Sequence, residues 1–190
     1  MRCVTSVKNC RQPCREAATV EERDYTPDMR DPALRAFIVR DGGFTLLTVA
    51  VWVLLLRSNS GIALHIIAAL MTVTVGYLAH EWGHLIGAWT RHSAVVIPKW
   101  TSPFLFNYDV SRNTNRQFTA MAMGGFVASA LFVVAVAILM PMHLLASKIA
   151  IALTVIGVIA TFILEVPTAW RVYRGAPLPQ QGPAFVSDKP

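Results

Sequence analysis

A long apolar run that ends in a cluster of polar side chains constrains this chain more than any other feature. Residues 62–79 include no Asp, Glu, Lys or Arg. As an α-helix this run is about 27 Å long, close to the roughly 30 Å hydrocarbon core of a bilayer. It ends in the pentad His-Glu-Trp-Gly-His at positions 80–84. The sequence therefore predicts a membrane-spanning helix that continues to about Trp89 and carries ionisable groups near one end.

Three further apolar segments cover residues 44–56, 118–139 and 144–164. Hydrophobic residues make up 54% of the chain and charged residues only 15%, a balance typical of membrane proteins. The segment 44–56 is short for a span, but the flanking Arg40 and Arg57 can extend it by reaching to the interface. We therefore expect an all-α, polytopic membrane protein with about four transmembrane helices.

The ends of these segments carry local signals. Pro32 is a favourable first helical residue, which predicts a short interfacial helix around Pro32–Val39. Pro167 disfavours helical backbone at the residue before it, so the last helix is expected to end near Val166.

The polar ends of the chain suggest three parts. Residues 1–40 read as a polar cytoplasmic leader, 41–170 as the transmembrane domain with a metal site, and 171–190 as a cytoplasmic tail. The leader holds Cys3, Cys10 and Cys14. Their spacing is not the paired pattern of zinc ribbons, and we interpret them as incidental thiols.

The distribution of basic residues predicts the orientation. The leader, the 91–117 loop and the tail are expected on one side of the membrane, and they carry most of the Lys and Arg. The turns expected on the opposite side carry only Arg57 and Lys148. The positive-inside rule then places both termini in the cytoplasm. We expect a multi-pass protein of a bacterial plasma membrane, in contact with the lipid bilayer. The net charge of +6 is assigned to these loops, and no nucleic-acid partner is expected.

The pentad has the spacing of a zinc site. His80 and His84 lie one helical turn apart, so both imidazoles can reach one zinc ion, and Glu81 lies where it can accept a proton from an attacking water. An alternative is that these groups lie past the membrane edge and face water. The metal is favoured because each ionisable group within a span costs about 2.5–3.5 kcal/mol and needs a partner.

Small residues surround this face. Gly76, Gly83 and Gly87 border the histidines in helical projection. The third apolar segment offers a matching strip of small residues within positions 124–129. The sequence therefore predicts close contact between the second and third helices.

Two segments resemble a known family. Residues 79–89, which include the pentad, look like the first active-site helix of the site-2 proteases, and residues 122–131 are similar to a small-residue segment of a later helix in that family. The resemblance covers about residues 60–170. It implies an intramembrane zinc metalloprotease with the metal near the cytoplasmic face, held by His80 and His84, and a transmembrane protein as substrate.

The chain departs from that family at the third ligand. The family supplies an Asp from a Leu-Asp-Gly motif, and this motif does not occur here. The nearest counterpart is Leu164-Glu165, so Glu165 is the expected third zinc ligand, with Asp109 as its rival. His92 is a weaker candidate, because the longer zinc motif that begins at the pentad has Thr90 where its third histidine belongs.

The missing motif keeps two other functions open. One is a non-catalytic membrane scaffold or assembly subunit that binds a membrane protein partner and retains the protease-like fold. The other is a zinc hydrolase with a small-molecule substrate.

Overall fold

The computed structural model describes residues 31–58, 61–179 and 185–186. The expectations for Cys3, Cys10 and Cys14, and for most of the leader, lie outside the described residues. The same holds for positions 180–184 and 187–190 of the tail.

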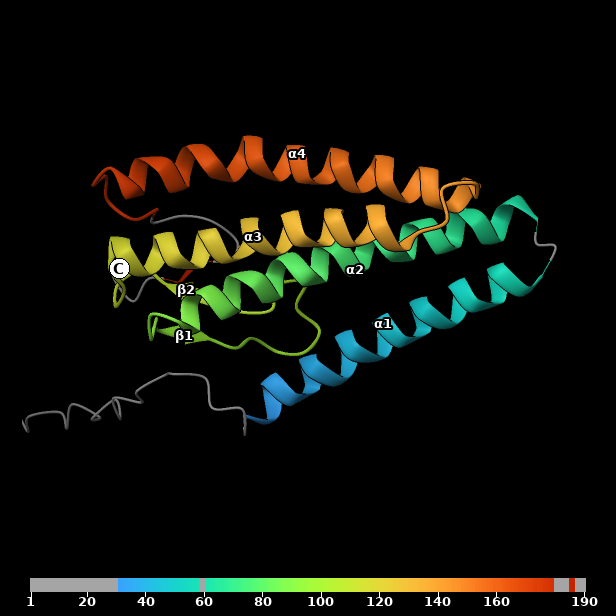
Figure 1. Ribbon diagram of the computed structural model, residues 1–190. Coiled ribbons are helices and arrows are strands. Elements are labelled where there is room, and N and C mark those ends of the chain that lie inside the picture. Colours follow the sequence, from blue (N-terminus) through green and yellow to red (C-terminus); the bar gives the residue numbers. More distant parts are fainter. Residues whose placement is uncertain (1–30, 59–60, 180–184, 187–190) are drawn as a thin grey trace, which may run out of the picture.

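The described chain is built on four long helices (Figure 1). They are α1 (Pro32–Arg57), α2 (Ile62–Trp89), α3 (Asn115–Leu139) and α4 (Leu145–Tyr173). Each is long and apolar enough to cross a membrane. Their outer faces expose large apolar side chains, among them Leu46, Ile138 and Leu164 at 72%, 74% and 75% exposure. The prediction of an all-α, multi-pass membrane protein is therefore confirmed.

Helix α1 corrects the expectation of two separate pieces. The predicted interfacial helix and the short span 44–56 form one helix of 26 residues, about 39 Å long. Asp31 caps its N-terminus by accepting a hydrogen bond from the N–H of Ala33 (2.8 Å). The helix continues through Arg40 and Asp41 because these two side chains pair with each other and with groups outside the helix.

Helix α4 corrects the expectation of a stop before Pro167. It continues through this proline to Tyr173. Proline removes one backbone donor, a cost that packed membrane helices tolerate. The extra turns are held from outside: the Asn115 amide donates to the carbonyls of Val172 (3.1 Å) and Ala176 (2.8 Å), and Val172 is buried.

Helix α2 runs over the predicted residues and packs against each of the other three helices. Helix α3 begins three residues before the predicted Phe118. Thr114 and Gln117 form a reciprocal capping box there, which satisfies the first free N–H groups of the helix.

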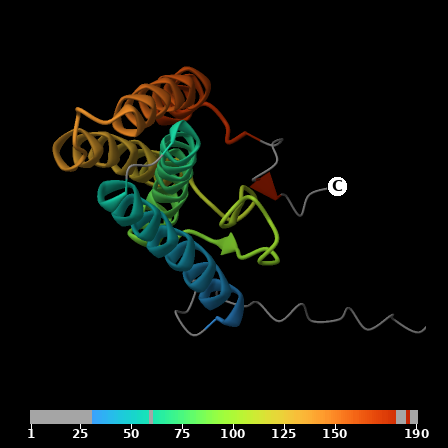
Figure 2. The same cartoon turned by 90° about the vertical axis from the view of Figure 1, so that its right-hand side faces the viewer.

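A small sheet at one end of the bundle was not predicted. It consists of β1 (Val95–Val96), β2 (Asn107–Asp109) and β3 (Phe185–Val186) in the order β1-β2-β3. β1 pairs antiparallel with β2, and β3 pairs parallel with it. Figure 2 shows the segment between α2 and α3 gathered beside the helices. We call this the sheet end of the bundle.

The main apolar core lies at the sheet end. It joins Phe37 of α1, Leu85 of α2, Phe118 of α3 and Val172 of α4 to Tyr108 of β2. One core thus ties all four helices to the sheet, which fixes the positions of the side chains that α2 and α4 carry nearby.

The predicted close contact of α2 with α3 is confirmed. A Cβ built on Gly83 would lie 2.5 Å from the Cβ of Ala128 and 2.6 Å from the carbonyl oxygen of Gly124. A Cβ on Gly87 would collide with the backbone of Ala120. The two backbones therefore approach to a distance that only glycine allows at these positions.

Candidate metal centre

His80 and His84 lie side by side on the face of α2 that packs against α3. They are buried, with 6% and 9% of their surface exposed. Their ring centroids are 4.3 Å apart and the ring planes are nearly perpendicular, at 76°. Their Nε2 atoms are 2.9 Å apart, as expected for two histidines one helical turn apart that aim at a common point.

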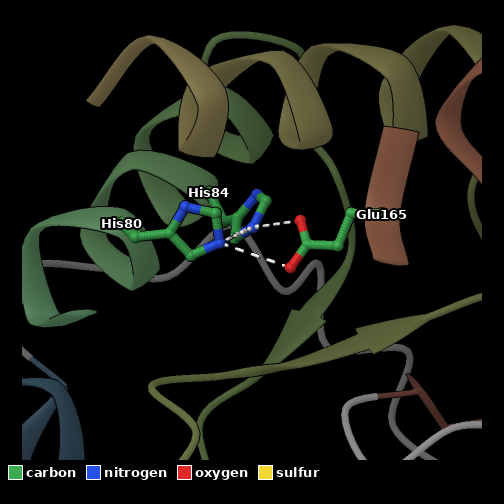
Figure 3. A group of neighbouring side chains, drawn as sticks. All are labelled: His80, His84 and Glu165. Carbon is green, nitrogen blue, oxygen red and sulfur yellow. Dashed lines mark hydrogen bonds and ion pairs between the residues drawn. The ribbon is translucent and has the colours of Figure 1, made fainter. Parts of the chain in front are cut away.

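Glu165 reaches the same point from α4. Its Oε1 is 3.4 Å from Nε2 of His80, and its Oε2 is 3.4 Å from Nε2 of His84. Figure 3 shows the carboxylate pointing at the two imidazole rings. These three side chains form the one group of His, Cys, Asp or Glu in the described part of the chain that could hold a metal ion.

The other ring nitrogens are held by α3. Nδ1 of His84 faces the carbonyl oxygen of Met121 at 2.9 Å. Nδ1 of His80 faces the carbonyl oxygen of Gly125 at 3.1 Å and the hydroxyl of Ser129 at 2.9 Å. A carbonyl only accepts hydrogen bonds, so each Nδ1 carries a proton and donates it. Such outer partners fix the ring orientation of metal-binding histidines.

This hydrogen bonding leaves both Nε2 atoms free for a cation. In neutral rings with protonated Nδ1, each Nε2 presents a lone pair, and here two lone pairs and a carboxylate converge. Electron pairs at 2.9 Å repel each other unless a proton or a metal ion lies between them. The donor set therefore has the electronic character of a cation site.

The spacing of the donors fits zinc. Bonds of about 2.0–2.2 Å in a tetrahedral site place two donor atoms roughly 3.3 Å apart. The three separations here are 2.9, 3.4 and 3.4 Å, so the donors need to move by only a few tenths of an ångström. Two histidines and one carboxylate also match the protein ligands of known catalytic zinc sites.

The rival ligand lies elsewhere. Asp109 belongs to β2, and its Oδ1 accepts hydrogen bonds from the backbone and hydroxyl of Ser111 and from the backbone N–H of Arg112. This carboxylate closes a turn in the loop. His65 accepts a hydrogen bond from the N–H of Ala146 (3.3 Å), and His92 adopts a left-handed backbone conformation after α2. None of these three joins the metal group.

Glu81 opens onto a cavity that the metal group shares. The cavity has a volume of about 300 Å³ and is lined by Glu81, His84 and Glu165 together with apolar side chains of the loop, α3, α4 and β3. Oε2 of Glu81 accepts a long hydrogen bond of 3.5 Å from the N–H of Leu105. The carboxylate is thus placed beside the group without belonging to it.

Sequence reasoning missed the contacts by which α1 holds α2, the helix that carries His80 and His84. Asp41 of α1 is buried, accepts a 2.9 Å hydrogen bond from the indole of Trp82, and pairs with Arg40 at 2.7 Å. Arg40 donates to the carbonyls of Trp100 (2.8 Å) and Ser102 (3.0 Å). The available signal was an acidic residue just before the apolar segment 44–56, since such a residue needs a partner if the helix extends through it.

Comparisons with protein-family models, with curated proteins and with solved structures find no match to this chain. The chemistry of the site rests on its own geometry.

Proposed function

We propose that this membrane protein is a zinc hydrolase of the intramembrane metalloprotease type, which cleaves membrane-embedded peptide segments. The observation that supports it is the meeting of His84, Glu165 and Glu81 at one cavity, with His80 completing the donor set. The same arrangement is what the resemblance to the site-2 proteases implies, with Glu165 in place of an Asp.

Each side chain has a distinct task in this proposal. His80, His84 and Glu165 hold the ion, and the carbonyls of Met121 and Gly125 keep the two rings turned towards it. When bound, zinc polarises the scissile carbonyl and the attacking water.

Glu81 moves the proton. It accepts a proton from the water as the water oxygen bonds to the carbonyl carbon. It then gives that proton to the amide nitrogen as the C–N bond breaks, so the products are a carboxylic acid and an amine.

The substrate must be locally extended. A helical backbone in lipid has all its peptide groups hydrogen-bonded, so a segment has to unwind before its peptide bond can reach Glu81. The cavity suits such a segment because Phe104 and Phe106 of the loop and Phe118 of α3 line it. We therefore propose a stretch of a transmembrane protein with apolar side chains as the substrate class.

The orientation is part of the proposal. The basic residues of the 91–117 loop lie at the sheet end, which supports a cytoplasmic sheet end and two cytoplasmic termini, as in a bacterial plasma membrane. A reporter fused after Pro190 is then cytoplasmic and one inserted between Pro141 and His143 is external. The reverse pattern would contradict this orientation.

Analysis of bound zinc in the wild type and in two alanine variants tests the metal site. Purified wild type is expected to hold one zinc per chain, and His80→Ala to lose it, because two donors do not close a site. His65→Ala is the matched control on the same helix and should keep the metal. Equal zinc in wild type and in His80→Ala would contradict the metal site.

Glu81→Gln separates catalysis from binding. It should keep zinc and lose cleavage of a membrane substrate, because the amide does not accept the proton of the water. Cleavage at the wild-type rate would show that Glu81 is not the base. The missing Leu-Asp-Gly motif favours a second candidate, a scaffold subunit, and zinc binding without cleavage of any membrane peptide would support it.

A further inference from the structure

Helices α3 and α4 enclose an apolar groove on a second face, lined almost entirely by residues other than those of the metal-site cavity. The groove has a volume of about 440 Å³. Its main lining residues are Met123, Phe126, Phe162, Val166, Trp170 and Tyr173. We call it the α3–α4 groove. Figure 1 shows the two helices running alongside each other from the sheet end to the opposite turn.

The groove opens at the sheet end into a cationic mouth. An adjoining cavity of about 340 Å³ shares Thr119, Met123 and Tyr173 with the groove and is also lined by Arg91 and Arg116. Both arginines are exposed, and neither makes an ion pair with any of the described residues. The apolar channel thus ends at two positive charges for which the described part of the chain supplies no counter-ion.

The mouth is held in place by side-chain amides. Gln117 of α3 donates to the carbonyl of Arg91 at the end of α2 (3.2 Å). Asn115 of α3 donates to the carbonyls of Val172 and Ala176 at the end of α4. Three helix ends are therefore fixed around the two arginines before any ligand arrives, which lowers the ordering cost of binding.

The length of the groove corresponds to one leaflet. Phe126 and Phe162 meet edge to face at 5.2 Å and close its inner end. Phe126 lies ten positions after Arg116 on α3, a rise of about 15 Å, which is half of the roughly 30 Å hydrocarbon thickness. Tyr173 lines both the groove and the mouth, and the ring of Trp170 lies 5.8 Å from the ring of Tyr173. Amphipathic aromatic side chains such as these favour the level of the lipid head groups.

We propose that the α3–α4 groove binds one anionic phospholipid, with its phosphate between Arg91 and Arg116 and an acyl chain along Met123, Val166 and Phe162. A free phosphate would occupy only the mouth and would leave the apolar groove unused. An apolar helix of another protein laid over the mouth would bury the two guanidinium groups without a counter-charge, which is costly. The proposal does not depend on the metal site.

Native mass spectrometry of the full chain in detergent, titrated with phosphatidylglycerol or phosphatidylcholine, tests the proposal. One phosphatidylglycerol is expected per chain, with about 25-fold preference over phosphatidylcholine, from about fivefold per arginine. Arg91→Gln and Arg116→Gln should each lower the preference about fivefold, and the double variant should abolish it. The double variant Lys99→Gln/Arg112→Gln changes the charge equally at the same end and should keep it.

A second variant tests the apolar part. Met123→Trp fills the groove and should weaken the binding of both lipids. Equal binding of the two lipids to wild type, or an unchanged preference in the Arg91→Gln/Arg116→Gln variant, would overturn the proposal. Displacement of phosphatidylglycerol by millimolar inorganic phosphate would reduce the site to an anion site and also overturn it. So would cross-linking of Met123→Cys to another protein in the membrane.

Discussion

The contact of α2 with α3 is closed by glycines, whereas the contact of α3 with α4 is held open by larger side chains. Gly83, Gly87 and Gly124 let the first pair of backbones touch. Between α3 and α4, Phe126 meets Phe162, and cavities of about 300 and 440 Å³ lie on the two faces of the pair.

The two contacts differ in function as well as in tightness: the α2–α3 contact fixes side chains in place, whereas the α3–α4 contact leaves space beside them. The closed side supplies the carbonyls that orient His80 and His84, a task that requires short and fixed distances. The open side carries Glu165 and the two cavities in which the proposed peptide and lipid would lie. The proposed site, which needs both fixed donors and an entrance, would thus be divided between two helix interfaces of different tightness.

The largest expected effect on stability comes from adding a side chain to the tight contact of α2 with α3. Gly83→Ala places a methyl group against Ala128 and the Gly124 carbonyl, so the two backbones must separate. We expect a net loss of about 2 kcal/mol in the free energy of unfolding, since severe overpacking costs up to about 3 kcal/mol and the helix preference for Ala offsets about 1 kcal/mol of it. The midpoint of thermal unfolding in detergent measures the effect.

The matched control is Gly157→Ala on α4, where a new Cβ meets nothing within 4 Å. Its unfolding midpoint should stay equal or rise slightly. If both variants behaved alike, the contrast between the tight and open sides would be wrong.

A second effect is expected at the open side, on metal binding. Glu165→Ala removes one of three donors and should lower zinc affinity at least 10–100-fold, the loss typical even of a supporting outer group. Asp109→Ala should change the affinity less, because that carboxylate closes a loop turn. Competition with a chromogenic chelator measures both values. A greater loss in Asp109→Ala would reverse the assignment of the third ligand.

The smallest effect is expected where α1 contacts α2, through Asp41 and Trp82. Asp41→Asn keeps an acceptor for Trp82 but loses the charge that pairs with Arg40, and we expect a cost of about 1 kcal/mol in unfolding free energy. Asp41→Ala leaves both Trp82 and Arg40 without this carboxylate and should cost more. Thermal unfolding of both variants provides the measurement. An Asp41→Ala protein as stable as wild type would show that this link does not support α2.

The parts of the fold that follow from local patterns were predictable. The extents of α2 and α3, the common face of His80 and His84, and the glycine contact all follow from hydropathy and helical spacing. The stop at Pro167 was wrong because tertiary hydrogen bonds from Asn115 hold the last turns of α4. The break in α1 was wrong because Asp41 finds its partner on another helix.

The sequence by itself determined that the chain crosses a membrane several times and that two histidines face one way on a helix, because both properties repeat within a few residues. Only the tertiary structure decided which carboxylate meets those histidines. Glu165 is 85 positions from His80, and its approach depends on how α4 packs across α3 and α2. The three-stranded sheet, the cavity beside Glu81 and the cationic mouth of the α3–α4 groove likewise arise from segments far apart in the chain, whose meeting no local pattern encodes.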